Sequence, residues 1–204
     1  MSNKLEQTIQ RLVASKSDEE AKQVYAEWQS YDSDLDAYGY IAPQLMANKL
    51  IAEVDEPDAL IYDAGCGTGK VGAALHTAGY QRLEGSDLSE SMLERAEALG
   101  IYQRLSVADF AQPLAHKNSY FDAAISVGVW KDHFGPNLTN ELLRIVKPGG
   151  YVALSIRPQF MPAFDAIADI LTKDETVRVC CNDLDDYIKG QQSTAHYVVM
   201  QKLA

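Results

Sequence analysis

Three glycines stand within five positions of the segment DAGCGTG, residues 63–69, and an acid, Asp63, comes directly before them. Glycines let the backbone approach a ligand closely, and N–H groups at the start of a following helix can hold an anion. The segment therefore predicts a ligand-binding loop, whose spacing discriminates between kinds of ligand.

Two phosphate-binding templates fail on this loop. A dinucleotide loop of the form GxGxxG that starts at Gly65 needs a glycine where Lys70 stands. A triphosphate loop needs glycine and Ser or Thr where the chain has Ala64 and Val71. A carboxylate beside the loop repels a pyrophosphate and attracts an ammonium. The loop therefore favours a ligand that carries both an ammonium and a carboxylate, such as an amino acid moiety.

Further acids stand at the ends of the next two predicted strands. Asp87 ends the segment RLEGSD, where an acid can accept hydrogen bonds from both hydroxyls of a ribose. Asp109 offers an acceptor for an exocyclic amine, and Phe110 offers an apolar surface for a purine. An amino acid, a ribose and an adenine together describe S-adenosylmethionine.

The elements that must position these residues alternate along the chain from residue 60 onward. Strands are expected at 59–64, 82–87, 104–109, 121–127, 150–156, 177–181 and 196–203, and helices at 69–79, 89–99, 137–146 and 160–172. This alternation predicts an α/β fold with a mostly parallel sheet covered on both faces. Ligands of such sheets lie outside the carboxyl ends of the strands, where the acids stand. No confident helix separates the last two strands, which favours an antiparallel hairpin at the sheet edge.

The N-terminal region, residues 1–55, is expected to be part of the same domain as the core at 56–204. Helices are expected at 4–14, 18–30 and 43–53, with a loop over residues 31–43. Tyr25 and Trp28 are expected to pack against the core. Tyr31, Tyr38 and Tyr40 are expected in a lid over the cofactor, because a cationic sulfonium is attracted to aromatic faces. The acidic DSDLD segment is interpreted as solvated surface.

Composition excludes several classes of function. Eighteen basic and 29 acidic residues give a net charge of −11 without a basic cluster, which disfavours binding to bulk nucleic acid. No apolar run approaches the ~20 residues of a membrane span, and the start resembles no targeting signal, so a cytoplasmic protein is expected. Three cysteines without a CxxC or HExxH pattern predict no metal site.

Five stretches resemble the motifs of class I methyltransferases: YDAGCGTG, LEGSDLSESMLERA, VADF, YFDAAISVG and LLRIVKPGGYVALSI. The stretch VYAEWQSYDSDLDAYGYIAP is also similar to the N-terminal signature of the Williams–Beuren-region methyltransferase-like subgroup. The resemblance covers roughly residues 25–203. It implies a Rossmann-like sheet of seven strands in the order 3-2-1-4-5-7-6, with the seventh strand antiparallel.

The resemblance also implies roles for individual residues. It places Asp63, Gly65 and Gly67 around the methionine part. Cys66 between them is expected to pack or to offer its backbone, since nothing nearby marks a base that would activate its thiol. It places Asp87 with Leu88 at the ribose, Asp109 with Phe110 at the adenine, and Val127 with Gly128 beside the methyl-bearing sulfur. The fourth motif has no NPPY or DPPY tetrapeptide, which argues against amino methylation of DNA bases or glutamine.

The segment GVWKDHFGP, 128–136, lies where the transferable methyl is expected. Asp132 and His133 could act there as a base or as substrate-orienting groups. Alternatively, Asp132 caps the helix that begins near Pro136, and His133 is solvated. The leading hypothesis is methyl transfer from S-adenosylmethionine to a small molecule. A protein methyltransferase and a regulatory module without turnover are the alternatives, and a nicotinamide-dependent oxidoreductase is a more distant one.

Overall fold

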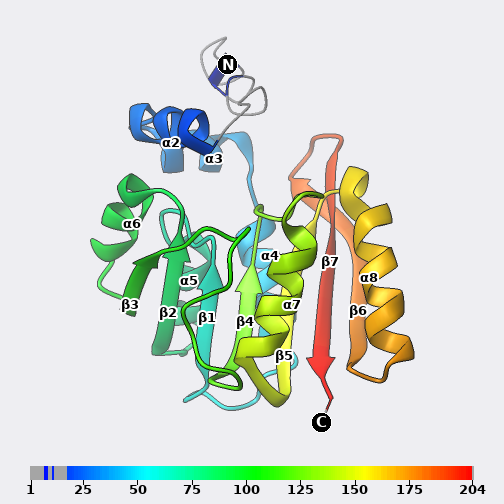
Figure 1. The fold of residues 1–204 in the computed structure, drawn as a ribbon. Helices are drawn as coiled ribbons and strands as arrows, with labels where there is room; N and C mark the ends of the chain where they lie inside the picture. Colours follow the sequence, from blue (N-terminus) through cyan, green and yellow to red (C-terminus); the bar gives the residue numbers. More distant parts are fainter. Residues whose placement is uncertain (1–6, 9–10, 12–17, 204) are drawn as a thin grey trace.

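The computed structural model describes residues 7, 8, 11 and 18–203 (Figure 1). The helix expected at 4–14 therefore lies largely outside the described residues. Among the helices that are described, none combines the length and apolar character that crossing a membrane requires.

One sheet runs through the described part of the chain, with the strand order β3-β2-β1-β4-β5-β7-β6. Its strands are β1 Leu60–Ala64, β2 Arg82–Asp87, β3 Tyr102–Val107, β4 Phe121–Ser126, β5 Val146–Ile156, β6 Val177–Ile188 and β7 Ser193–Lys202. Strand β7 pairs antiparallel with both β5 and β6, and the other pairs are parallel. The predicted fold class, strand order and antiparallel seventh strand are confirmed.

The edge hairpin of β6 and β7 is confirmed, but its strands are longer than the sequence predicts. Residues 182–188 continue β6 although they include Asp183, Asp185 and Asp186, a residue type that strands disfavour. Ladder pairing with β7 overrides that local preference, because Asn182 faces Val198 and Asp186 still faces Thr194. The extension carries Tyr187 up to the carboxyl ends of the parallel strands.

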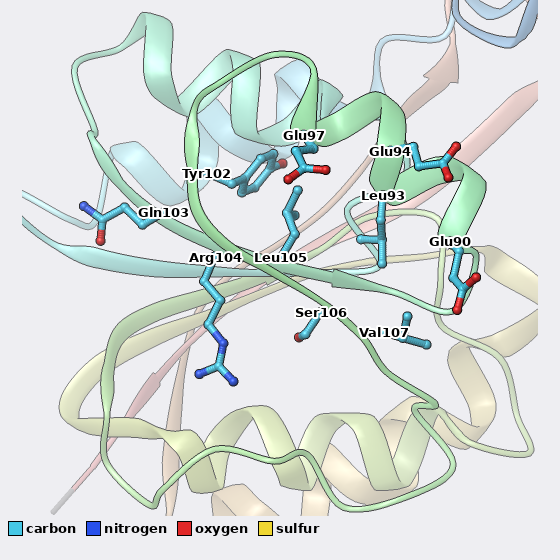
Figure 2. Close-up of a pocket in the computed structure, with 10 residues that line it drawn as sticks. All are labelled: Glu90, Leu93, Glu94, Glu97, Tyr102, Gln103, Arg104, Leu105, Ser106 and Val107. Atoms are coloured by element: carbon cyan, nitrogen blue, oxygen red, sulfur yellow. The ribbon is translucent and has the colours of Figure 1, made fainter.

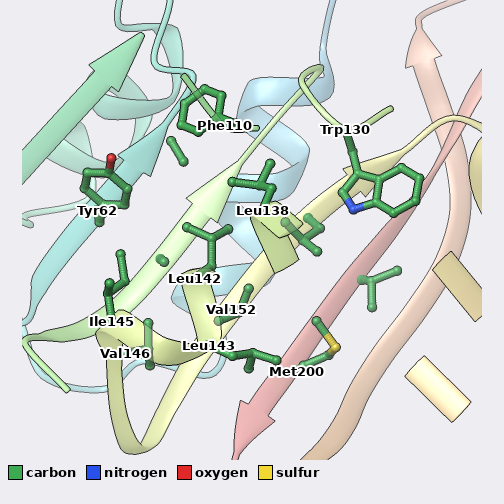
Figure 3. Close-up of a cluster of buried hydrophobic side chains, with 14 of the residues drawn as sticks. Tyr62, Phe110, Trp130, Leu138, Leu142, Leu143, Ile145, Val146, Val152 and Met200 are labelled. Carbon is green, nitrogen blue, oxygen red and sulfur yellow. The ribbon is translucent and has the colours of Figure 1, made fainter. Parts of the chain in front are cut away.

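Helices cover both faces of the sheet (Figure 1). α4 Ala42–Ile51 and α5 Lys70–Thr77 pack on one face, and α7 Gly135–Ile145 and α8 Met161–Lys173 on the other. Side chains alternate along β1, so that Leu60 and Tyr62 join the core beneath α7 while Ile61 joins the core beneath α4. Figure 3 shows Tyr62 in the same cluster as Leu138 of α7. Both faces of β1 are thus buried, which holds the loop after it in place.

The expectation of a loop over residues 31–43 is wrong, because α3 Tyr31–Tyr38 forms there after α2 Asp18–Glu27. Asp32 and Asp34 lie in its first turn, where negative charge complements the helix dipole. Gly39 ends the helix in a left-handed conformation with φ of 85°. Figure 1 shows α2 and α3 above the carboxyl ends of the parallel strands.

Trp28 joins this N-terminal layer to the rest of the chain and is buried. Its indole Nε1 donates a hydrogen bond to Asp34 at 2.7 Å, and its carbonyl accepts one from Arg95 at 3.0 Å. Arg95 belongs to α6 Glu90–Glu97, which packs beside β2 and β3. Trp28 therefore packs between α3 and α6 and not in the two main hydrophobic clusters.

Candidate functional site

The carboxyl group of Asp63, near the end of β1, is buried. The phenol of Tyr102 donates a hydrogen bond to its Oδ2 at 2.6 Å. Its Oδ1 is buried and has no hydrogen-bond partner among the described residues. Burial raises the pKa of this carboxyl from 3.8 to about 7, although the Tyr102 hydrogen bond opposes the change. An unsatisfied buried oxygen is costly, so Asp63 is ready to accept a hydrogen bond from a ligand.

The glycine loop follows in a backbone conformation that favours glycine. Gly65, Gly67 and Gly69 have φ of 77°, 54° and 92°. The N–H groups of Gly65 and Cys66 donate to the Ser86 carbonyl at 2.8 and 2.9 Å. These N–H groups are therefore used within the chain. A Cβ at Gly67 would meet open space, so a ligand can approach the backbone closely there, whereas the side chain of Val129 fills that space at Gly65.

Asp87 at the end of β2 is held by two backbone donors. Gly67 N–H donates to its Oδ2 and Ser89 N–H to its Oδ1, both at 2.9 Å. Burial raises the pKa of Asp87, and these backbone hydrogen bonds oppose the rise. Each oxygen keeps a further lone pair, so the carboxylate is oriented and can still accept ribose hydroxyls. Leu88, which follows it, is half-buried.

Asp109 and Phe110 lie beyond the end of β3, which stops at Val107. Asp109 is exposed and accepts a hydrogen bond from the N–H of Ala111 at 2.8 Å, so it caps a local turn. The Phe110 side chain is buried in the cluster beneath α7, and its carbonyl accepts a hydrogen bond from Asn137 at 2.9 Å. Both residues thus have local structural roles, and the adenine contact stays a prediction.

Helix α3 is fastened to the glycine loop by two polar contacts. The Thr68 hydroxyl donates to Asp32 at 2.6 Å, and the Lys70 ammonium binds Asp36 at 2.7 Å. Both aspartates are still on the surface, with side chains 44% and 64% exposed, so the DSDLD segment is solvated as expected and also binds the glycine loop. Lys70, which breaks the dinucleotide template, serves to hold α3.

Tyrosines from α2 and α3 gather next to this loop. The Tyr31 ring meets that of Tyr25 edge to face at 5.9 Å and that of Trp28 at 5.0 Å. Burial raises the pKa of Tyr25 and of Tyr31, and the nearby Asp87 adds to both shifts. Tyr31, a predicted lid residue, therefore lies close enough to Asp87, the residue predicted to bind the ribose, to interact with it electrostatically.

Gly128, two residues after β4, lies against two phenols. A Cβ at this position would be 2.6 Å from the Tyr187 hydroxyl and 3.2 Å from the Tyr40 hydroxyl. The two hydroxyls are 3.2 Å apart and their rings 5.0 Å apart. Val127, which precedes Gly128, is buried. The structure thus brings the predicted residues Tyr40, Val127 and Gly128 together, and adds Tyr187.

The two tyrosines are placed by backbone pairing between distant segments. Ile41 N–H donates to the Tyr187 carbonyl at 3.3 Å, and Lys189 N–H donates to the Gly39 carbonyl at 2.8 Å. The connection from α3 to α4 is thereby joined to the end of β6. We call residues 31–41 together with 187–189 the roof, because they lie across the carboxyl ends of the strands.

Sequence reasoning missed Arg157, which follows β5 directly. Its guanidinium carbon lies 4.6 Å from the centre of the Tyr187 ring. Its Nε is buried and has no hydrogen-bond partner among the described residues. The rule that strand ends carry the site would have identified Arg157, whereas no local signal distinguishes Tyr187 from other strand aromatics.

Asp132 and His133 are exposed on the connection between β4 and α7. The His133 ring meets Phe134 edge to face at 4.8 Å. Helix α7 begins at Gly135 without a capping side chain. Within the described chain, no hydrogen bond or ion pair links either residue to Asp63, Asp87 or the tyrosines. Their catalytic role stays a prediction.

A groove of about 310 Å³ lies elsewhere, between α6 and the edge strand β3 (Figure 2). Its lining consists of Glu90, Leu93, Glu94, Glu97 and residues 102–107. No predicted cofactor residue lines it, and Figure 2 shows Arg104 turned away from Leu93. The strand-end residues and not this groove therefore define the candidate site.

The amino-acid sequence is similar to those of known methyltransferase domains. Residues 61–150 match a family model described as a methyltransferase domain. Human "Methyltransferase-like protein 27" is 39% identical over 156 residues, which are 72% of this chain. The chain spans 64% of the length of that relative.

Solved structures share the fold. A chain of the complex between the Haloferax volcanii Trm112 methyltransferase activator and a methyltransferase aligns with a TM-score of 0.69 and 17% identity, over 88% of this chain and 96% of that one. Magnesium protoporphyrin IX methyltransferase from Synechocystis, solved with bound S-adenosylmethionine, aligns with a TM-score of 0.61 and 18% identity, over 96% and 90%. At these identities the likeness concerns the fold alone.

Proposed function

This chain belongs to the class I S-adenosylmethionine-dependent methyltransferases, and we propose on that premise that it transfers a methyl group from S-adenosylmethionine to a small-molecule acceptor. The observation that carries the proposal is the buried, unpartnered Oδ1 of Asp63 beside a glycine loop. Such an oxygen suits an ammonium donor and repels a phosphate.

The residues present fit the methionine and ribose parts of the cofactor. Asp63 and the backbone of Gly65 and Gly67 would hold the methionine part. Asp87, oriented by its two backbone donors, would accept the ribose hydroxyls. Bound there, the cofactor supplies a methyl group on a sulfonium sulfur, and Val127 and Gly128 would line that end.

The tyrosines would orient the acceptor and exclude water from it. Burial raises the pKa of Tyr40 and of Tyr187, so both phenols stay protonated near neutral pH. They can donate hydrogen bonds but do not act as bases. In-line displacement needs mainly proximity and alignment, which a roof at Gly128 can provide.

The position of the roof favours a small acceptor over a polypeptide. Two polar contacts attach α3 to the glycine loop, one between Thr68 and Asp32 and one between Lys70 and Asp36. The hydroxyls of Tyr40 and Tyr187 cover Gly128. A protein acceptor would have to enter beneath this layer or displace it. A regulatory module without turnover has the same cofactor residues and differs only in the absence of product.

The test is release of S-adenosylhomocysteine during incubation with a metabolite library, with the Asp87→Ala variant as the blank. Turnover with a small molecule supports the proposal. Turnover only with peptides or proteins would replace the small acceptor by a polypeptide. Cofactor binding without any turnover would favour the regulatory module.

A further inference from the structure

We propose that Arg157 binds a carboxylate of the methyl acceptor, so that the acceptor is a small organic acid. This inference rests on the proposed function and specifies its substrate class. It is carried by three features of Arg157: its place in the fold, its contact with Tyr187, and the lack of a partner for its charge.

Arg157 stands at the methyl-transfer end of the site. It follows β5, the neighbour of β4, whose continuation holds Gly128. The Gly128 N–H donates to the Ser155 hydroxyl of β5 at 2.9 Å, which ties the two strand ends together. Arg157 stacks on Tyr187, and the Tyr187 hydroxyl lies against Gly128. One ring therefore connects the guanidinium to the place where methyl transfer is proposed.

The charge of Arg157 has no partner within the described residues. No ion pair or hydrogen bond of its guanidinium is found there, and its Nε is buried. This is notable in a chain with a net charge of −11. The residue as a whole is half-buried, and a cation that is partly removed from water without a partner is costly unless something compensates for it. A cation–π contact with Tyr187 compensates in part and leaves the N–H donors free.

Free guanidinium donors beside a reaction centre suit a planar anion. Arginine presents its N–H groups in a fork that matches a carboxylate in two parallel hydrogen bonds. A phosphate shares this chemistry, and the experiment below separates the two. The protonated phenols of Tyr40 and Tyr187 would add neutral donors next to the same anion.

The carboxylate of the cofactor is a less suitable partner for Arg157. Asp87 on β2 is the proposed ribose ligand, and β5 lies three strands further along the sheet, roughly 14 Å at strand spacing. Asp63 on β1, between them, is the proposed partner of the methionine ammonium. Arg157 thus lies on the far side of Gly128 from the cofactor residues, where an acceptor approaches.

The experiment measures binding of matched acid and amide pairs to the protein saturated with S-adenosylhomocysteine. Benzoate and benzamide, phenylacetate and phenylacetamide, and aliphatic pairs of rising size are titrated by ligand-observed NMR. Phenyl phosphate is included as the phosphate arm. The variants are Arg157→Gln and Arg157→Lys, and the matched control is Arg178→Gln, an exposed arginine of β6 that donates to Gln201.

We expect acids to bind the unaltered protein and the Arg178 control about tenfold or more tightly than their amides. The preference should vanish in Arg157→Gln and weaken in Arg157→Lys, which keeps the charge and loses the fork. Equal binding of acids and amides, or an acid preference unchanged in Arg157→Gln, overturns the proposal. A stronger preference for phenyl phosphate than for every acid overturns the carboxylate assignment.

Titration of S-adenosylmethionine into the same variants separates this inference from the proposed function. We expect Arg157→Gln to bind the cofactor as the unaltered protein does. Loss of cofactor binding in that variant alone would assign Arg157 to the cofactor carboxylate and overturn the proposal. Absence of cofactor binding in the unaltered protein would refute the proposed function, while the acid preference would still be measured without cofactor.

Discussion

The Thr68 hydroxyl donates a hydrogen bond to the Asp32 carboxylate at 2.6 Å and so joins two residues 36 positions apart. Thr68 belongs to the glycine loop, and Asp32 belongs to the first turn of α3. The helix that covers the site is therefore attached directly to the loop that would bind the cofactor. Movement of the roof and access of the cofactor should be coupled through this contact.

Thr68→Val tests that coupling, because it removes the hydroxyl and keeps the shape of the side chain. A hydrogen bond to a charged group contributes about 1.5–3 kcal/mol, so the roof should open more often. We expect S-adenosylmethionine to dissociate at least about tenfold faster, measured by stopped-flow displacement. The control is Thr77→Val, whose hydroxyl bonds only within α5 to the Ala73 carbonyl. Equal dissociation rates in the two variants would show that the contact does not restrain the cofactor.

Gly128→Ala should impair the methyl-transfer end of the site through a collision. The new Cβ would lie 2.6 Å from the Tyr187 hydroxyl, in a backbone conformation with φ of 77°. Gly149→Ala is the matched control, because its φ of 82° carries the same strain while its Cβ would meet open space. Any extra loss in melting temperature or turnover in Gly128→Ala therefore measures the collision.

Removal of the Tyr187 hydroxyl provides an internal check on that interpretation. Tyr187→Phe combined with Gly128→Ala should recover part of the melting temperature that Gly128→Ala loses. No recovery in the double variant would mean that backbone strain, and not the phenol, causes the loss.

Asp63→Asn should stabilise the cofactor-free protein in a pH-dependent way. A pKa of about 7 in the folded state, against an ordinary value of 3.8, disfavours the ionised form by on the order of 4 kcal/mol. Between these two values the folded state binds more protons than the unfolded state, so the contribution of Asp63 to stability falls as the pH rises. Asparagine does not titrate and avoids this loss.

Urea unfolding at several pH values measures the effect as the difference between variant and unaltered protein. The advantage of Asp63→Asn should widen from pH 4 to about pH 7 and level off above it. Tyr102 should keep an acceptor in the variant, since asparagine retains one side-chain oxygen. A difference that is constant over this pH range would show that Asp63 ionises normally in the folded protein.

The sequence predicted the sheet because its signals are local. Alternating runs of strand and helix and the glycine loop each depend on a few adjacent residues. The same reasoning selected Asp63 and Asp87. They stand at the carboxyl ends of neighbouring parallel strands, and such ends lie at the same edge of the sheet. It missed α3, because the acids and aromatics of residues 31–38 also suit a loop.

The roof could not be predicted from local patterns because long-range contacts build it. Tyr187 reaches Gly128 only because β6 extends along β7 and then pairs with residues 39–41. In the sequence, Asp32 and Asp36 suggest only solvated surface. Their contacts with Thr68 and Lys70 appear once the fold brings these residues together. Arg157 directly follows a predicted strand, so its position could have been recognised from the sequence. That its Nε is buried without a partner can be seen only in the structure.

Calorimetric titration of S-adenosylmethionine tests whether the loop after β1 and Asp87 bind that cofactor. We expect saturable one-to-one binding near the micromolar range, lost in Asp87→Ala and retained in Asp165→Ala, an exposed aspartate of α8. Because Asp87 also holds Gly67 and Ser89, a melting curve of each variant should accompany the titration. Unchanged affinity in a folded Asp87→Ala variant would show that Asp87 does not bind the cofactor, and no binding by the unaltered protein would show that this site does not.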